Sequence, residues 1–179
     1  MVDLLQLLAL QLGSEVSYQE LASSLGIDRL TVRKYIDLLE QCFIIFRQRA
    51  FSRNLRKEIS KTVKIYFYDL GVRNSLIQAY NPLHLRADIG ALWENFCIVE
   101  RRKLVQYHKM YRNTYFWRTY DQKEIDYIEE YDGQLDGYEF KWSPAKSFKV
   151  PQDFIDTYQN ASVERVDRSN YWKFVLPEN

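Results

Sequence analysis

Three charged side chains in the second half of the chain have the types and spacing of a site that cleaves phosphodiesters. Asp126 precedes Glu139, and Lys141 follows Glu139 after one intervening residue. Carboxylate oxygens are the ligands that Mg²⁺ takes in proteins, and an ammonium group beside them can stabilise an attacking hydroxide or the charge that develops at phosphorus. The arrangement suggests metal-assisted hydrolysis, with Mg²⁺ or Mn²⁺ as cofactor and metal ligands at Asp126 and Glu139, although the pattern by itself is also that of a solvated face.

A predicted β-hairpin positions these side chains. Its strands are expected at Glu124–Tyr131 and Leu135–Trp142. Asp132-Gly133 lies between two alternating segments, which is a strong signal for a two-residue turn because both central positions of that turn need positive φ. The register of the hairpin then follows by counting outward from the turn.

In that register Asp126 faces Glu139 and Glu124 faces Lys141, so the four side chains share one face. Two opposed carboxylates destabilise a sheet unless something offsets their repulsion, and a divalent cation would do so. The alternative is an ordinary solvated face, since a half-exposed antiparallel sheet has the same pattern. The other face is apolar and is expected to join the core with Ile125, Tyr127, Tyr138 and Phe140.

Three segments extend the pattern beyond the hairpin. Asp126 and the run Glu139-Phe140-Lys141 are similar to the core of the PD-(D/E)xK, restriction-endonuclease-like nucleases. The wider set resembles the C-terminal domain of a large prokaryotic family of AAA-type ATPases, in which an ATPase module is followed by a winged helix and then by a nuclease-like domain. The resemblance extends from about Val16 onward and rests on GALWENF (Gly90–Phe96), YFWRTYDQKEIDYI (Tyr115–Ile128) and YEFKW (Tyr138–Trp142).

The resemblance implies that Glu94 joins Asp126 and Glu139 at the metal and that Lys141 assists catalysis. A long helix opened by Asp88 and running to about Lys109 is expected to hold Glu94 at the margin of its apolar side. A carboxylate there needs a partner, and the alternative to a metal is a salt bridge, for instance with Arg101 or Arg118. The chain departs from the nuclease pattern in two places. Ile125 stands where the motif has proline, and no Gln-x-x-x-Tyr element follows, so kinship with the RecB-like branch is not supported.

The composition of the 179 residues is that of a globular protein, and the formal net charge of +1 conceals a split. Residues 28–64 contain ten Arg and Lys against four Asp and Glu, whereas residues 121–139 contain one Lys against eight Asp and Glu. This asymmetry predicts a phosphate-binding surface in the first part and a cation-binding surface in the second.

The location of the protein is predicted from what the sequence lacks. No apolar run approaches the length of a transmembrane helix, and the N-terminus has no signal-peptide pattern. Cys42 and Cys97 lie in apolar surroundings and are expected to be buried thiols in a reducing cytoplasm. We therefore expect a cytoplasmic protein without a membrane partner. No Gly-rich phosphate loop is present, so the chain alone is not expected to be an ATPase.

Residues 1–80 are predicted to form a winged helix-turn-helix domain. A capping box at Ser17 opens one helix, which stops at Gly26, and Asp28 caps a second helix that runs to about Gln41. The inward residues of the second helix are expected to be Leu30, Val32, Tyr35, Ile36 and Leu39. Strands are expected at Phe43–Arg49 and Thr62–Asp69, with a basic wing between them.

Such a domain would place its second helix in the major groove of DNA and its wing against phosphates. Winged helices also serve as protein-interaction modules, which is the alternative here. The nucleic-acid-binding residues would be Arg29, Arg33 and Lys34 on the helix and Arg53, Arg56 and Lys57 on the wing.

Residues 81–179 are predicted to form the nuclease-like domain. After the long helix we expect a strand at Tyr111–Tyr120, the hairpin, a helix from Pro151 to about Asn160 and a last strand at Tyr171–Leu176. The fold class is therefore α/β (α+β) with a mixed central sheet.

The residue pattern and the resemblance together give two functional hypotheses. The first is a divalent-metal-dependent nuclease acting on nucleic acid, DNA above all, and forming the C-terminal part of an AAA-type ATPase. The second is a non-catalytic module that binds DNA or a partner protein. In both cases the expected partners are nucleic acid and an AAA-type ATPase module in the same or an associated chain.

Overall fold

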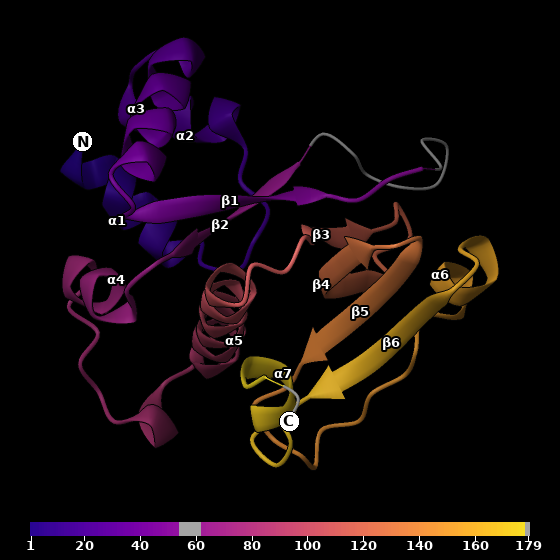
Figure 1. Cartoon of the computed structure of the whole chain (residues 1–179). Helices are drawn as coiled ribbons and strands as arrows, with labels where there is room; N and C mark the ends of the chain where they lie inside the picture. Colours follow the sequence, from indigo (N-terminus) through magenta and orange to yellow (C-terminus); the bar gives the residue numbers. More distant parts are fainter. Residues whose placement is uncertain (54–61, 178–179) are drawn as a thin grey trace. The chain divides into compact units, whose positions relative to one another are not determined.

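The computed structural model describes residues 1–53 and 62–177, which form a mixed α/β structure (Figure 1). The chain divides into two compact units. Unit 1 comprises Met1–Gln48 and Thr62–Asn95, and unit 2 comprises the described parts of residues 49–61 and 96–179. The units are therefore not continuous in sequence, and the predicted domain boundary after residue 80 stays a prediction.

Unit 1 has the order of elements that we expected of a helix-turn-helix followed by two strands. Ser17 Oγ accepts a hydrogen bond from the backbone N–H of Glu20, and Gly26 ends the first of these helices in the left-handed conformation with φ of 64°. Asp28 caps the next helix through the N–H of Thr31. The elements are α1 (Val2–Leu10), α2 (Tyr18–Leu25), α3 (Arg29–Gln41), β1 (Ile45–Ala50), β2 (Val63–Phe67), α4 (Leu70–Leu76) and the 3₁₀ helix η1 (Leu83–Leu85).

The core of unit 1 confirms most of the predicted inward residues of α3. Val32, Ile36 and Leu39 are buried. The prediction for Leu30 is wrong: this side chain is 59% exposed, because it lies two residues before the buried Val32, a step that turns it about 200° around the helix, away from the buried face. The prediction of a buried Cys42 is also wrong, since this residue follows α3 as its exposed C-cap.

Unit 2 is built on the strands that follow α5 (Ile89–Tyr107), a helix that begins in unit 1. These strands are β3 (Asn113–Arg118), β4 (Glu124–Tyr131), β5 (Gln134–Phe140) and β6 (Ala161–Val166). Strands β3, β4 and β5 pair antiparallel, and β6 pairs parallel with β5. Neighbouring strands are hydrogen-bonded in the order β2-β1-β3-β4-β5-β6 among the described residues. The last residues of β1 run parallel to β3, so the sheet is mixed.

The end of the chain differs from the prediction. Residues 171–176 were expected to form the last strand, but they contain the helix α7 (Trp172–Val175). The last strand is β6, which lies beside β5 after the helix α6 (Gln152–Thr157). Val163 and Ala161 of β6 pack on the core, whereas the aromatic residues near Phe174 cover the opposite face of the sheet. The predicted strand is wrong because the backbone of this segment bonds to itself: the N–H of Val175 donates to Tyr171 O, and Phe174 reaches Tyr138 from this helical turn.

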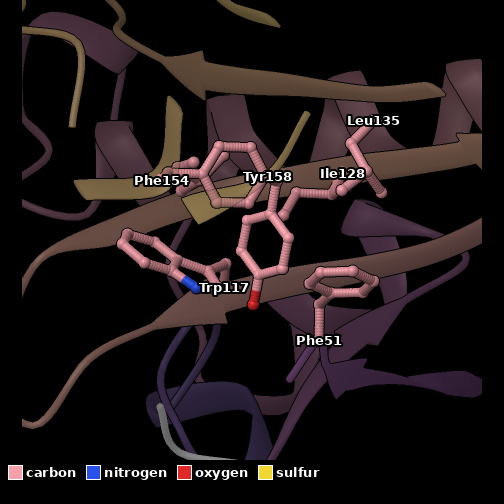
Figure 2. Close-up of a cluster of buried hydrophobic side chains, with 7 residues drawn as sticks. Phe51, Trp117, Ile128, Leu135, Phe154 and Tyr158 are labelled. Carbon is pink, nitrogen blue, oxygen red and sulfur yellow. The ribbon is translucent and has the colours of Figure 1, made fainter. Parts of the chain in front are cut away.

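One face of the unit 2 sheet packs against α6 in a cluster of aromatic and aliphatic side chains. Figure 2 shows the ring of Tyr158 lying between those of Phe154 and Phe51, with ring centroids 5.0 Å and 5.2 Å away. Trp117 meets Phe154 edge to face at 5.1 Å. This packing fixes the strands that hold the predicted site. The buried members are Phe51, Trp117, Ile125, Ile128, Leu135, Phe154 and Tyr158.

None of the described helices has both the length and the apolar character that are needed to cross a lipid bilayer.

Candidate functional site

The hairpin of β4 and β5 has the predicted turn, and its register is the predicted one from the turn as far as Tyr127 opposite Tyr138. The predicted pairs Asp126–Glu139 and Glu124–Lys141 lie beyond this paired stretch. Asp132 and Gly133 have φ of 46° and 78°, as a two-residue turn with two left-handed positions requires. Tyr131 pairs with Gln134, and the pairing continues in step to Tyr127 opposite Tyr138. The predicted two-residue loop is therefore confirmed.

A β-bulge in β4 changes the faces close to the site. Trp117 of β3 pairs with Ile125 and Tyr115 pairs with Ile128, so one residue of β3 lies opposite two residues of β4. As a result Ile125 joins the cluster of Figure 2, whereas Tyr127 packs on the other face against Phe174 at 5.8 Å. The prediction that these two residues share one core face is wrong, because the bulge interrupts the alternation between them.

The bulge directs Asp126 toward the adjoining strand. Asp126 is 9% exposed, and its Oδ2 accepts a hydrogen bond from the backbone N–H of Phe140 at 2.8 Å. Glu139 and Lys141 flank that residue in β5. The Lys141 ammonium pairs with Glu139 Oε1, and the backbone N–H of Lys141 donates to Val166 O at 3.0 Å. Asp126, Glu139 and Lys141 are therefore brought together at the end of β5.

The Glu139 carboxyl group is buried close to a second negative charge. Burial, followed by the negative charge of Asp126, raises the pKa of Glu139 from 4.5 to about 7. The hydrogen bond and charge of Lys141 oppose this rise, and Glu124 adds to it. Glu139 Oε2 is buried and has no hydrogen-bond partner within residues 1–53 and 62–177. The negative charge of Glu139 is thus only partly balanced, by its contact with the Lys141 ammonium group.

Glu94 has partners of its own in unit 1. Its Oε1 accepts hydrogen bonds from Tyr66 Oη at 2.5 Å and from Lys64 Nζ at 3.2 Å. The partners suggested from the sequence bond elsewhere: Arg101 pairs with Glu129, and Arg118 donates to Gln122. Sequence reasoning missed Lys64 and Tyr66, although their spacing of two residues on one strand places both on the same face.

Over the part of the chain that the structure describes, no group of three or more His, Cys, Asp and Glu side chains is arranged to hold a metal ion. Asp126 and Glu139 nevertheless suit a hard divalent cation. Mg²⁺ is commonly bound by one or two carboxylates together with water and substrate phosphates. An unbonded, buried carboxylate oxygen on Glu139 beside a second carboxylate is the kind of donor that a cation would satisfy. The role of Glu94 as a third ligand stays a prediction.

The predicted nucleic-acid contacts of unit 1 are partly accessible. Arg29, Arg33 and Lys34 are exposed on α3, as DNA contact would require. Arg53 belongs to unit 2, where it is exposed and forms an ion pair with Glu130. Arg56 and Lys57 lie outside the described residues.

The structure thus defines a mixed α/β protein with an acidic pair and a lysine at the end of a β-hairpin. Residues 1–83 match a family described as "Domain of unknown function (DUF8612)", and residues 89–171 match "Domain of unknown function (DUF4143)". The second match contains Glu94, Asp126, Glu139 and Lys141.

Two curated mycobacterial proteins are similar to the chain. They are "Uncharacterized protein Mb2031c" of Mycobacterium bovis and "Uncharacterized protein Rv2008c" of Mycobacterium tuberculosis. Each is 30% identical over 131 residues, which is 72% of this chain and 29% of the relative. The matched segment therefore spans less than a third of each relative's length. No solved structure matches the chain significantly.

Proposed function

We propose that the chain is a divalent-metal-dependent nuclease whose site is centred on Asp126 and Glu139. The observation that supports this proposal is the partly compensated Glu139 carboxylate, which lies against Asp126 and is paired with Lys141. Native proteins seldom bury such an arrangement without a use for it, and carboxyl groups with a strongly perturbed pKa are concentrated at functional sites.

In this proposal the residues of β4 and β5 have distinct roles. Asp126 and Glu139 would hold Mg²⁺ or Mn²⁺, and the Phe140 N–H fixes the orientation of Asp126. The chemistry that such a cation would supply is positive charge that activates water and offsets the charge developing at phosphorus. Lys141 exchanges its contact with Glu139 for the substrate phosphate or the attacking water, where its ammonium stabilises negative charge.

Cleavage of plasmid and of labelled oligonucleotides in Mg²⁺ or Mn²⁺ tests the proposal. Asp126→Ala and Lys141→Ala should each lower the rate of cleavage by about a hundredfold or more, which is the effect that the loss of one electrostatic catalytic group commonly has. Asp121→Ala, which removes an exposed carboxylate just before β4, is the matched control and should cleave like the native protein. Activity that persists unchanged in Asp126→Ala and Lys141→Ala would refute the assignment.

A second candidate function is a DNA-binding module without catalysis. The exposed row Arg29, Arg33 and Lys34 on α3 favours it, because these cations lie where a recognition helix would meet DNA. This candidate predicts binding that weakens steeply with salt but no cleavage with any metal. We further propose, from the family resemblance, that the chain acts with an AAA-type ATPase module in the same or an associated chain. A cytoplasmic location stays a prediction.

A further inference from the structure

The segment that follows Lys141 contains cations that the proposed chemistry does not use. Lys146 and Lys149 are exposed in the loop between β5 and α6, and Arg168 is exposed just after β6. In the portion of the chain that the structure describes, no acidic side chain pairs with any of the three. Several other cations among the described residues of unit 2 differ in this respect: Lys103 pairs with Glu100, for example.

Contacts between strands hold this loop beside the acidic pair. Arg165 of β6 lies next to Glu139 of β5 in the parallel register. Its Nη1 donates to the backbone oxygens of Pro144 at 3.2 Å and Lys146 at 3.3 Å. The charge of Arg165 is itself neutralised by Asp167 at 2.9 Å. Arg165 is therefore an anchor, and the uncompensated Lys146 is kept near the end of β5.

Arg168 is presented in a fixed position. Asp167 Oδ1 accepts hydrogen bonds from the backbone N–H of Ser169 at 2.8 Å and from its hydroxyl at 2.5 Å, which holds the turn that contains Arg168. The Arg168 guanidinium stacks 4.5 Å from the centre of the Trp142 ring, and its Nε donates to Trp142 O at 2.9 Å. Both partners are neutral, so the positive charge and the outer N–H groups of Arg168 stay available for a planar anion.

Figure 1 shows the arrowheads of β5 and β6 side by side, next to α7. Lys146 and Arg168 are therefore held at the end of the unit 2 sheet to which the acidic pair belongs, and Lys149 follows Lys146 in the same exposed loop. We propose that Lys146, Lys149 and Arg168 bind the phosphate backbone of a nucleic acid that passes the Asp126–Glu139 site. This inference rests on the proposed function, and it identifies a phosphate-contact surface separate from α3.

The expected effect follows from counterion release. Each phosphate contact adds about 0.9 to the slope of log affinity against log salt for duplex DNA and about 0.7 for a single strand. At about 0.1 M salt, one lost contact then weakens binding about eightfold on a duplex and about fivefold on a single strand. The double variant Lys146→Ala with Lys149→Ala should bind about 25- to 60-fold more weakly, with a slope lower by about 1.4 to 1.8.

Fluorescence anisotropy of the full chain with labelled single-stranded and duplex oligonucleotides measures these quantities, in EDTA so that no cleavage occurs. The control is the double variant Lys103→Ala with Lys123→Ala, which removes two exposed lysines that are already paired with acidic residues. It should bind like the native protein. Arg168→Ala should lose one contact, and Arg168→Lys should recover part of the affinity because it keeps the charge but not the planar stack.

A background in which the three α3 cations are replaced by alanine separates the two surfaces. The loop variants should weaken binding in that background by the same factor as in the native protein. Binding that is unchanged in the loop variants, equal weakening in the control pair or no binding of any oligonucleotide would overturn the inference. Failure of the nuclease proposal is distinguishable: the native protein would then bind through this loop, with the predicted slopes, yet cleave nothing in Mg²⁺ or Mn²⁺.

Discussion

Replacing Glu139 with glutamine tests whether a carboxyl group is buried beside Asp126, independently of any catalytic assay. In the folded protein, burial and the neighbouring carboxylate raise the pKa of Glu139 from 4.5 to about 7. In the unfolded chain both causes are absent. Between these two values the folded state binds a proton at Glu139 that the unfolded state has already released.

Because the folded state binds more protons in this window, the free energy of unfolding falls as pH rises from about 4.5 to about 7. A shift of one pKa unit corresponds to about 1.4 kcal/mol, so Glu139 lowers stability by about 3 kcal/mol above pH 7 and by nothing below pH 4.5. The Glu139→Gln variant lacks this contribution. We compare the free energy of unfolding of Glu139→Gln with that of the native protein. The difference in favour of the variant should be about 3 kcal/mol larger near pH 8 than near pH 4.

Urea unfolding at several pH values, followed by tryptophan fluorescence, measures the effect. The chain has four tryptophans, and two of them, Trp93 and Trp117, are buried, so unfolding should change their emission. Groups that titrate elsewhere affect both proteins alike and cancel in the difference. Glu164→Gln, at an exposed carboxylate on β6, is the control and should show no comparable change. A difference between native protein and Glu139→Gln that is independent of pH would refute the reasoning.

The same measurement near pH 8 connects stability to the proposed metal. A ligand that binds only the folded state stabilises it by about 2.7 kcal/mol at a hundred times its dissociation constant. Mg²⁺ should therefore raise the stability of the native protein, since it would satisfy the charged Glu139. Glu139→Gln should respond much less. Equal responses of the two proteins would place any bound Mg²⁺ away from Glu139.

Three further predictions concern stability and can be checked by urea or thermal unfolding. Glu129→Ala should cost about 3 to 5 kcal/mol, because it leaves the guanidinium groups that pair with Glu129 uncompensated. Gly137→Ala should cost about 1 to 3 kcal/mol of folding stability, since the new Cβ would lie 3.1 Å and 3.2 Å from neighbouring atoms. Gly90→Ala is the control: its Cβ would meet nothing within 4 Å, so it should not destabilise the protein. Ser17→Ala should cost about 1 kcal/mol through loss of the α2 cap.

Local sequence signals predicted the elements that depend on local chemistry. Asp132-Gly133 specified both the turn and the register of the hairpin, because few residues tolerate two consecutive left-handed positions. Ser17 and Asp28 marked where helices begin, since their side chains accept the backbone N–H groups that a first turn leaves unbonded. Asp126 was expected directly opposite Glu139. The strand pairing continues only to Tyr127 opposite Tyr138, and Asp126 meets β5 through the backbone N–H of Phe140, the residue after Glu139.

Features that depend on distant segments could not be predicted in this way. The bulge at Asp126 and Tyr127 arises from the pairing of β4 with β3, which the β4 sequence does not specify. The bonding of Glu94 to Lys64 and Tyr66 depends on how α5 packs against β2. Interactions between elements far apart in the chain are visible only once the tertiary fold is known.

Glu139 can be compared with a second buried glutamate in the same hairpin, Glu129. That side chain is 0% exposed, yet Arg101 holds both of its oxygens at 2.7 Å and 2.8 Å, and Arg112 and the Tyr127 hydroxyl bond to it as well. The fold can therefore satisfy a buried glutamate on these strands.

Glu139, in the same hairpin, is paired with one lysine, lies against a second carboxyl group and keeps a buried oxygen without a hydrogen bond in the described residues. Burial and the charge of Asp126 raise the pKa of Glu139, so we expect this arrangement to lower the stability of the fold at neutral pH. A structural role would be better served by the bonding that Glu129 has. The difference between the two glutamates is the one expected of a cation-binding site. A bound cation would supply the positive charge that neighbouring side chains supply to Glu129 but only partly to Glu139.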